Sequence, residues 1–320
     1  METRTDLTAF ARKTGEIKQR IAEIIVGQTE AVDLLLTCVI ADGHVLLEGV
    51  PGVAKTLLAR LVSRLIDARF SRVQFTPDLM PSDVLGTSVF NMKTSEFDFH
   101  PGPAFADIVL ADEINRAPAK TQAALFEVME ERQISIDGTT HRMGDLYTIL
   151  ATQNPVEQEG TYKLPEAQLD RFLMKITMDY PSLEEEVNIL ERHHTNAALV
   201  KLDDITPAIT KEELLSLRAF MNQVFVDRTL LQYIALIVQQ TRTSKAVYLG
   251  ASPRASVAML QSSKAYALLQ GRDFVTPEDI KFVAPYVLQH RLILTAEAEM
   301  EGYSPVKVTQ RLIDKVEVPK

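Results

Sequence analysis

Hydrophobic positions in the first part of the chain follow two alternating patterns. Short apolar runs of strand length lie at 44–48, 107–111, 146–152 and 173–176, and residues 69–75 alternate between apolar and polar as in a strand. Other segments carry apolar residues at helical spacing, at 6–25, 29–41, 57–62 and 120–131. The run Ile108-Val109-Leu110-Ala111 is apolar throughout, which is typical of a parallel strand covered by helices on both faces. Strands and helices in this order predict an α/β domain.

The pattern changes near Tyr180-Pro181-Ser182. Beyond that point the apolar spacing is only helical, and it predicts helices at roughly 183–195, 211–223, 227–243, 254–270 and 277–293. We therefore predict an α/β core with an N-terminal helix at 1–181 and an all-helical domain at 182–320. Two polar segments inside the core, 87–100 and 132–143, read as hairpins, the second turning at Asp137-Gly138.

A glycine-rich loop, Gly49-Val50-Pro51-Gly52-Val53-Ala54-Lys55-Thr56, joins the first strand-like run to a helical segment. Strand, loop and helix in this order are the context of a P-loop, in which backbone N–H groups and the helix dipole face a phosphate. We expect Lys55 to reach the β- and γ-phosphates of a nucleotide and the Thr56 hydroxyl to ligate Mg²⁺. The alternative is an ordinary Gly-Pro turn.

One position of this loop departs from the usual P-loop pattern, because Ala54 stands where glycine is expected. A methyl group is tolerated there if the residue has a helical, negative φ.

Two acids, Asp112 and Glu113, follow the buried strand 107–111. In a P-loop sheet such a strand lies beside the P-loop strand, so its carboxyl end meets the phosphates. We expect Asp112 on the metal side and Glu113 beside the attacking water, because phosphoryl transfer needs positioning and charge stabilisation rather than covalent chemistry. Asn154, which follows the strand 146–152, is expected to hold the same water. The alternatives are a solvated acid pair and a turn former before Pro155.

Composition narrows the function classes. Hydrophobic residues make up 46% and charged residues 24% of 320 residues, as in a soluble globular protein. A net charge of −9 repels a phosphate backbone and argues against nucleic-acid binding. The single cysteine, Cys38, excludes a disulfide framework within one chain. Adjacent His193 and His194 diverge on a helix and make poor joint metal ligands. No stretch approaches the ~18 apolar residues of a membrane span, so we expect a cytoplasmic protein.

Taken together, these segments resemble the AAA+ ATPases, and within them the MoxR family. The resemblance runs from about Val26 to Leu294. It rests on the segments 26–28, 48–56, 74–83, 101–105, 112–118, 151–155, 164–172 and 252–255. It implies an AAA+ P-loop core, a parallel sheet flanked by helices with two hairpin inserts, followed by an all-α lid domain. The hairpin at 87–100 corresponds to the helix-2 insert of the family.

The resemblance also implies site residues. Nucleotide contacts are expected from Val26, Gly27, Gly49, Pro51, Gly52, Val53, Ala54, Lys55, Thr56 and Leu57, and metal contacts from Thr56 and Asp112. Glu113 is expected to act in hydrolysis, and Asn154 matches sensor 1. Arg171 matches the arginine finger that acts on a neighbour's nucleotide, and Arg254 matches sensor 2. By themselves, isolated arginines at element boundaries are usually surface residues.

The family implies an ATPase that uses ATP and Mg²⁺, forms a homo-oligomeric ring that is typically hexameric, and remodels or matures client proteins together with a von Willebrand factor A domain partner. Three other functions stay open at this point. They are a nucleic-acid motor of the helix-2-insert group, a subunit like the small magnesium-chelatase ATPase, and a nucleotide-dependent scaffold that does not hydrolyse ATP.

Overall fold

The computed structural model describes residues 7–154, 162, 164–195 and 202–318, so Pro155 lies outside the described residues. Its centre is a five-stranded sheet with the order β2-β5-β8-β1-β9. These strands are β1 (Val45–Gly49), β2 (Phe70–Gln74), β5 (Ile108–Asp112), β8 (Thr148–Gln153) and β9 (Met174–Met178). All neighbouring pairs are parallel, so the strands begin at one edge and end at the opposite edge. The predicted parallel α/β core is confirmed.

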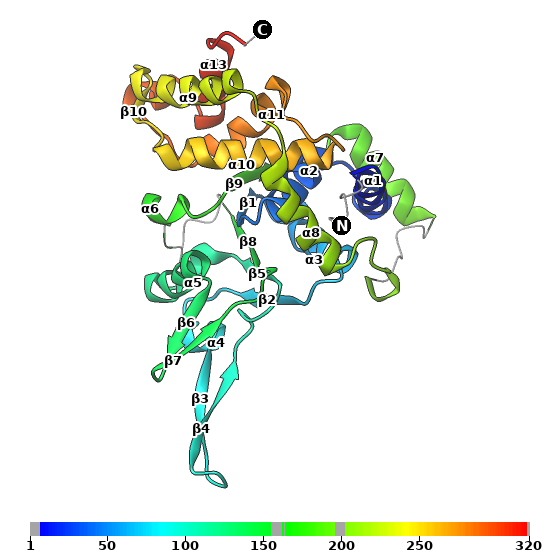
Figure 1. Ribbon diagram of the computed structural model, residues 1–320, viewed down its shortest axis with the longest axis vertical. Helices are drawn as coiled ribbons and strands as arrows, with labels where there is room; N and C mark the ends of the chain where they lie inside the picture. The colour runs from blue at the N-terminus through cyan, green and yellow to red at the C-terminus, as the bar shows by residue number, and fades with distance from the viewer. Residues whose placement is uncertain (1–6, 155–161, 163, 196–201, 319–320) are drawn as a thin grey trace.

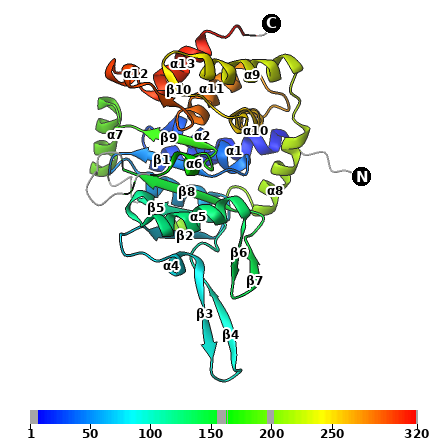
Figure 2. The ribbon, with the colours of Figure 1, turned by 90° about the vertical axis from the view of Figure 1, so that its left-hand side faces the viewer.

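Different helices bury the two faces of this sheet (Figures 1 and 2). Leu47 and Leu110 face the helices α1 (Leu7–Ile24), α2 (Thr29–Ile40) and α3 (Lys55–Leu65). The alternate residues Leu46, Val109 and Ala151 face α4 (Pro81–Leu85) and α5 (Ala119–Glu131). Successive side chains of a strand point to opposite faces, which explains why the strand-like runs are almost continuously apolar.

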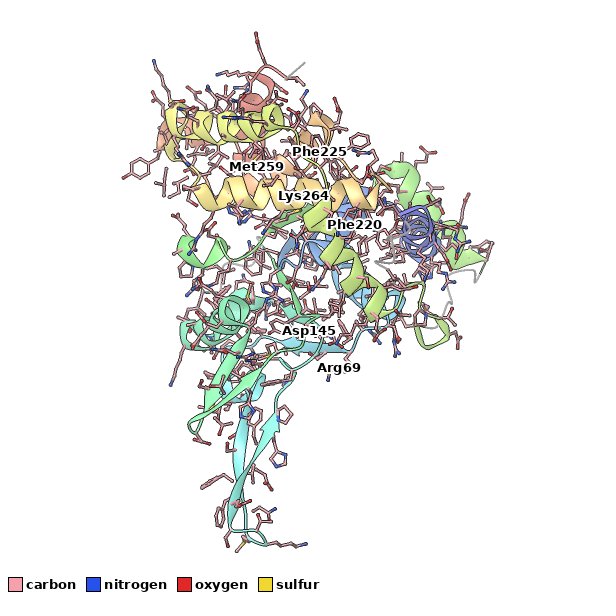
Figure 3. All side chains as sticks on the ribbon, viewed as in Figure 1. Arg69, Asp145, Phe220, Phe225, Met259 and Lys264 are labelled. Atoms are coloured by element: carbon pink, nitrogen blue, oxygen red, sulfur yellow. The ribbon has the colours of Figure 1, made fainter. Side chains whose placement is uncertain are left out.

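The edge at which the strands begin lies away from the P-loop. Arg69, which precedes β2, and Asp145, which precedes β8, are labelled at this edge in Figure 3. Buried His44 precedes β1 and accepts a hydrogen bond at Nδ1 from the Ile149 N–H, at 3.0 Å, while its Nε2 lies 3.1 Å from the carbonyl oxygen of Met129. Burial lowers the pKa of His44 to about 4, so the ring is neutral and Nε2 carries the proton. This side chain ties β1, β8 and α5 together.

Both predicted hairpins are present and project from the body of the core (Figures 1 and 2). One is formed by β3 (Gly86–Asn91) and β4 (Glu96–Pro101), the other by β6 (Gln133–Ile136) and β7 (Thr139–Arg142). Phe90 and Phe97 pair edge to face on the first hairpin, with ring centroids 5.3 Å apart.

The remaining described elements are mostly helices. Short helices η1 (Ile114–Arg116), α6 (Glu166–Leu169) and η2 (Leu202–Asp204), and the longer α7 (Leu183–His194), connect parts of the core and the lid. The lid contains α8 (Lys211–Phe220), η3 (Met221–Gln223), α9 (Arg228–Thr243), α10 (Pro253–Leu269), α11 (Pro277–Leu288), α12 (Ala296–Met300) and α13 (Pro305–Asp314). Among the residues that the structure describes, no helix is long and apolar enough to cross a membrane.

The expectation of a lid made only of helices is wrong in one detail. β10 (Val247–Leu249) and β11 (Ile293–Leu294) form a small antiparallel sheet in it. The helix predicted at 277–293 accordingly ends at Leu288, since the chain must turn to enter β11. The lid packs against the core: Met259 of α10, labelled in Figure 3, is fully buried in the cluster that also contains α1, α2 and α3. The boundary predicted at 181–182 stays a prediction.

Candidate active site

Three predicted site segments meet at the edge where the strands end. The glycine-rich loop follows β1, and Asn154 follows β8. Asp112 is the last residue of β5, and Glu113 comes directly after it. The expectation that the strand ending in Asp112 lies beside the P-loop strand is wrong, because β8 is inserted between β5 and β1. The three segments are still neighbours in space, since β8 pairs with both of the other strands. The edge at the carboxyl ends of parallel strands is where open α/β sheets bind their ligands.

Close backbone packing explains the first glycine of the loop. A Cβ atom on Gly49 would lie 2.5 Å from the carbonyl oxygen of Met178 on β9, so only glycine fits there. Gly52 has φ of +90°, a conformation that glycine adopts without strain. The Lys55 ammonium group donates a hydrogen bond to the Gly49 carbonyl, which holds the lysine over the loop.

Ala54 does not have the helical φ at which a methyl group is tolerated. Ala54 is left-handed, with φ of 63° and ψ of 21°, and it directly precedes the first residue of α3. A Cβ atom in this region is crowded by its own backbone, at a cost of roughly 1–2 kcal/mol. The loop therefore keeps the conformation of a P-loop glycine with an alanine in its place.

Asp112 is held by three side chains. Its Oδ1 accepts a hydrogen bond from Thr152 Oγ1, at 2.6 Å. Its Oδ2 accepts from Arg72 Nη2, at 2.6 Å, and from Thr56 Oγ1, at 3.2 Å. Asp112 is only 6% exposed, so these donors fix the position of a carboxylate that would otherwise lose its hydration without compensation.

Glu113 is oriented separately, on the solvent side of the same edge. Its Oε2 accepts from Gln74 Nε2, at 2.9 Å, and pairs with Arg116 Nε, at 3.0 Å. Its backbone N–H donates to Thr152 Oγ1, at 2.9 Å, and its φ of 57° turns the chain sharply after Asp112. The two carboxylates therefore have different partners: that of Asp112 accepts from Thr56, and that of Glu113 bonds to Gln74 and Arg116.

The Thr56 hydroxyl and the Asp112 carboxylate suit a Mg²⁺ ion that is shared with phosphates. Both are hard oxygen donors, and the 3.2 Å between them is short enough for one ion to contact both. No group of three or more His, Cys, Asp or Glu side chains is placed to hold a metal within the described residues. Magnesium in nucleotide sites is usually held by one or two protein oxygens plus phosphates and water, which these residues fit.

A pocket of about 250 Å³ opens beside the glycine-rich loop. It is lined by Ile24, Ile25, Val26, Gln28, Gly52, Val53, Ala54, Leu57, Pro181, Ile189, Arg192 and His193. Its apolar walls suit a flat aromatic base whose phosphates extend into the loop. The predicted residues Val26, Gly52, Val53, Ala54 and Leu57 line it. Gly27 lies between the lining residues Val26 and Gln28, and a Cβ atom on it would lie 2.5 Å from the Glu185 carboxylate.

The two predicted arginines lie elsewhere. Arg171 follows α6 and precedes β9, at the edge where the strands begin, and its Nη2 pairs with Glu130 Oε2, at 2.7 Å. Arg254, at the start of α10, lies 3.9 Å from the same Glu130 and 3.7 Å from Asp170. In Figure 1, α6 lies on the left-hand side of the molecule and α7, which lines the pocket, on the right-hand side. The structure thus brings the arginines together and does not bring them to the phosphate loop of their own chain.

Known proteins resemble this chain over nearly its whole length. Residues 44–174 match the model of the ATPase family associated with various cellular activities, and residues 239–314 match the AAA lid domain. The YeaC protein of Bacillus subtilis is 47% identical over 95% of this chain and 94% of its own. Chaperone MoxR1 of Mycobacterium tuberculosis is 44% identical over 94% of this chain and 81% of its own. Protein MoxR of Methylorubrum extorquens is 30% identical over 92% and 91%. The chain belongs to the MoxR family of AAA+ ATPases.

The fold of this MoxR-family chain agrees with that assignment. A solved structure of a protein from Cytophaga hutchinsonii superposes with a TM-score of 0.89, at 40% identity, over 98% of this chain and 97% of its own. The AAA+ core and lid expected from the sequence are therefore confirmed. Membership of the family supports ATPase activity in general.

Sequence reasoning missed several residues of the MoxR-family site. Arg72 and Gln74 hold the two acids, yet they lie on β2, a strand to which the sequence assigns no role. The feature that identifies these two residues is the pairing of β2 with β5, which places Gln74 opposite Asp112. Ile189, Arg192 and His193 reach the pocket from α7, and only the packing of that helix against the loop reveals them.

Proposed function

We propose that this protein hydrolyses Mg-ATP and uses the energy to remodel or mature client proteins. The observation that carries the proposal is the meeting of Lys55, Thr56, Asp112 and Glu113 at one edge of the sheet, beside a pocket of suitable size for a base. A P-loop, a metal-side acid and a separate second acid are the parts that nucleotide hydrolysis needs.

Each part has its own task in this proposal. The loop N–H groups and Lys55 bind the phosphates, while Thr56 and Asp112 hold Mg²⁺, which neutralises charge on the phosphate oxygens when bound. Glu113, fixed by Gln74 and Arg116, orients the attacking water and accepts its proton. Asn154, which is 7% exposed at the end of β8, helps to orient the same water.

The position of the arginines supports a ring assembly. Arg171 and Arg254 lie at the edge where the strands begin, so a chain cannot place them on its own phosphates without a large rearrangement. A neighbouring copy can supply them, and head-to-tail contacts of this kind close into rings. We propose a homo-oligomeric ring, hexameric as is typical of the family, in which Arg171 serves as the finger and Arg254 as sensor 2.

The proposal includes two further kinds of partner, a client protein and a protein with a von Willebrand factor A domain, and a cytoplasmic location. Its support is the resemblance to the MoxR family, including a relative named Chaperone MoxR1. A nucleic-acid motor has less support, since the net charge is −9 and the tip of the first hairpin sets Glu96 and Asp98 against a single Lys93.

Phosphate release from Mg-ATP by the purified protein tests the proposed activity, and calorimetry on Lys55→Ala tests the site. Losing a charge-assisted contact to phosphate costs about 1.5–3 kcal/mol, so we expect the variant to bind Mg-ATP at least about 10-fold more weakly. Lys93→Ala, on the exposed hairpin, is the control and should bind as the wild type does. Unchanged affinity in Lys55→Ala would remove the P-loop assignment. Tight binding without phosphate release would favour the scaffold instead.

A further inference from the structure

Three consecutive lid residues, Gln289, His290 and Arg291, bond to the segment of the core that carries Arg171. Gln289 Nε2 donates to the carbonyl oxygen of Lys175, at 2.5 Å, and His290 Nε2 lies 3.0 Å from the carbonyl oxygen of Phe172. Arg291 then contributes more bonds than the other two together. This stretch lies between α11 and β11, so the lid and the start of β9 are joined at one point.

The guanidinium group of Arg291 uses all of its donors. Nε donates to Asp170 Oδ1, at 2.6 Å. Nη2 donates to the carbonyl oxygens of Phe172, at 2.7 Å, and Asp170, at 3.1 Å. Nη1 donates to the carbonyl oxygen of Leu173, at 3.1 Å, and to that of Val287. A guanidinium has five N–H donors in a rigid fork, and these are five bonds, so the geometry of the group is fully determined.

Four of these five bonds end on the residues that flank Arg171. Asp170 and Phe172 are its neighbours on either side, and Leu173 follows. The Arg291 side chain is 5% exposed, which means that the bonds are shielded from competing water. By contrast, among the residues that the structure describes, the Arg171 side chain bonds through its terminal nitrogens to Glu130 and, at 3.3 Å, to the carbonyl oxygen of Ala167. The backbone at Arg171 is fixed, while its side chain stays able to change partner.

We propose that Arg291 is a positioning residue for the arginine finger: it fixes the backbone on both sides of Arg171 so that the side chain meets a neighbouring subunit's nucleotide. The proposal rests on the function proposed above. It also includes Arg254, since Asp170 lies between the two arginines, bonded to Arg291 and 3.7 Å from Arg254. The lid of one subunit thereby sets the position of the groups that act on the next subunit.

Arg291→Lys is the first test, because lysine keeps the positive charge but has three donors and no fork. A displacement of about 1 Å in a catalytic group costs up to about 10²-fold in rate, so we expect kcat to fall roughly 10- to 100-fold. The KM for ATP should stay within about 2-fold, since the P-loop is untouched. The matched control is Arg272→Lys, which alters another arginine that is paired with a buried carboxylate, Asp279, but lies wholly within the lid. It should leave kcat near the wild-type value.

Mixed assemblies separate a misplaced finger from general damage. An Arg291→Lys subunit has an intact nucleotide site and a displaced finger, so it should regain activity with Glu113→Gln subunits, which carry an intact finger. It should regain none with Arg171→Ala subunits, since both then lack a working finger. Recovery with both partners, recovery with neither, or a raised KM without loss of kcat would overturn the proposal.

Two further experiments keep the test decisive. If Arg291→Lys does not fold, Asp170→Asn takes its place, because it removes the charge that faces Arg291 Nε and keeps the side-chain shape; the same selective recovery is expected. Glu113→Gln is also mixed with Arg171→Ala. If that pair recovers activity, but the Arg291 variant does not show the same pattern of recovery in mixtures as Arg171→Ala, only the role of Arg291 is refuted. If that pair fails although it co-assembles, the finger itself is refuted, and the role of Arg291 with it.

Discussion

Ala54 carries a conformation that suits glycine, with φ of 63° just before α3. Glycine there would relieve roughly 1–2 kcal/mol of strain in the folded state. It would also raise the conformational entropy of the unfolded chain, which lowers the free energy of unfolding by about 0.4–1 kcal/mol. We therefore expect Ala54→Gly to leave the free energy of unfolding unchanged or to raise it by up to about 1.6 kcal/mol, measured by urea unfolding.

Ala123, exposed in the interior of α5, is the matched control for that substitution. Ala123→Gly should lower the free energy of unfolding by about 1 kcal/mol, because glycine is a poor helix former. A gain in stability, or a smaller loss, at Ala54 than at Ala123 supports strain in the loop. An equal loss of stability at both would mean that Ala54 is not strained.

Glu113 is predicted to act in hydrolysis rather than in nucleotide binding. Since Asp112 bonds to Thr56 whereas Glu113 bonds to Gln74, the change Glu113→Gln should leave binding of Mg-ATP intact. It should slow turnover at least ~10²-fold, the range expected on losing a general base. The readouts are calorimetric ATP affinity and steady-state phosphate release, with Glu127→Gln on the exposed face of α5 as control. A Glu113→Gln enzyme that turns over at the wild-type rate contradicts the assignment.

At the scale of the elements, the core was predictable because its central strands β5, β8 and β1 are buried on both faces. Such strands appear in the sequence as apolar runs, which differ from the helical spacing of the other segments. Once the strands are recognised, the P-loop and the two acids can be located at their ends. The pair β10–β11 was missed because Val247–Leu249 and Ile293–Leu294 are too short to leave a period. The helix α13 was overlooked although Ser304-Pro305 is a recognisable helix start.

Contacts between elements were the part that the sequence did not reveal. The role of Arg72 depends on β2 lying beside β5, and a strand order cannot be read from periodicity. Arg171 illustrates the same limit. Asp170 and Glu166 are its acidic neighbours in sequence, yet its side chain pairs with Glu130 of α5. Local sequence suggests partners within a turn, whereas the fold brings a helix from elsewhere in the chain.

At the scale of the whole molecule, the pocket beside the glycine-rich loop and the two arginines lie apart, so in the proposed function a neighbouring copy must supply the arginines. Arg171 pairs with Glu130 and is 27% exposed, and it must leave that partner to reach a phosphate on a neighbouring copy. An exposed pair of this kind contributes at most about 1 kcal/mol, so the exchange is easily offset by a charged phosphate. Arginine fingers are worth roughly 10³- to 10⁵-fold in rate where they act on GTPases.

Mixing two inactive variants tests whether the ring completes the site. Glu113→Gln lacks the water-orienting group and Arg171→Ala lacks the finger, so each alone should be inactive. Random mixing in a closed ring leaves about a quarter of the interfaces with both groups intact, and a comparable share of the activity should return. Light scattering checks that the variants assemble, and each variant mixed with wild type measures how dominant it is. If co-assembled rings stay inactive, Arg171 does not act between subunits, and its contact with Glu130 is its structural role.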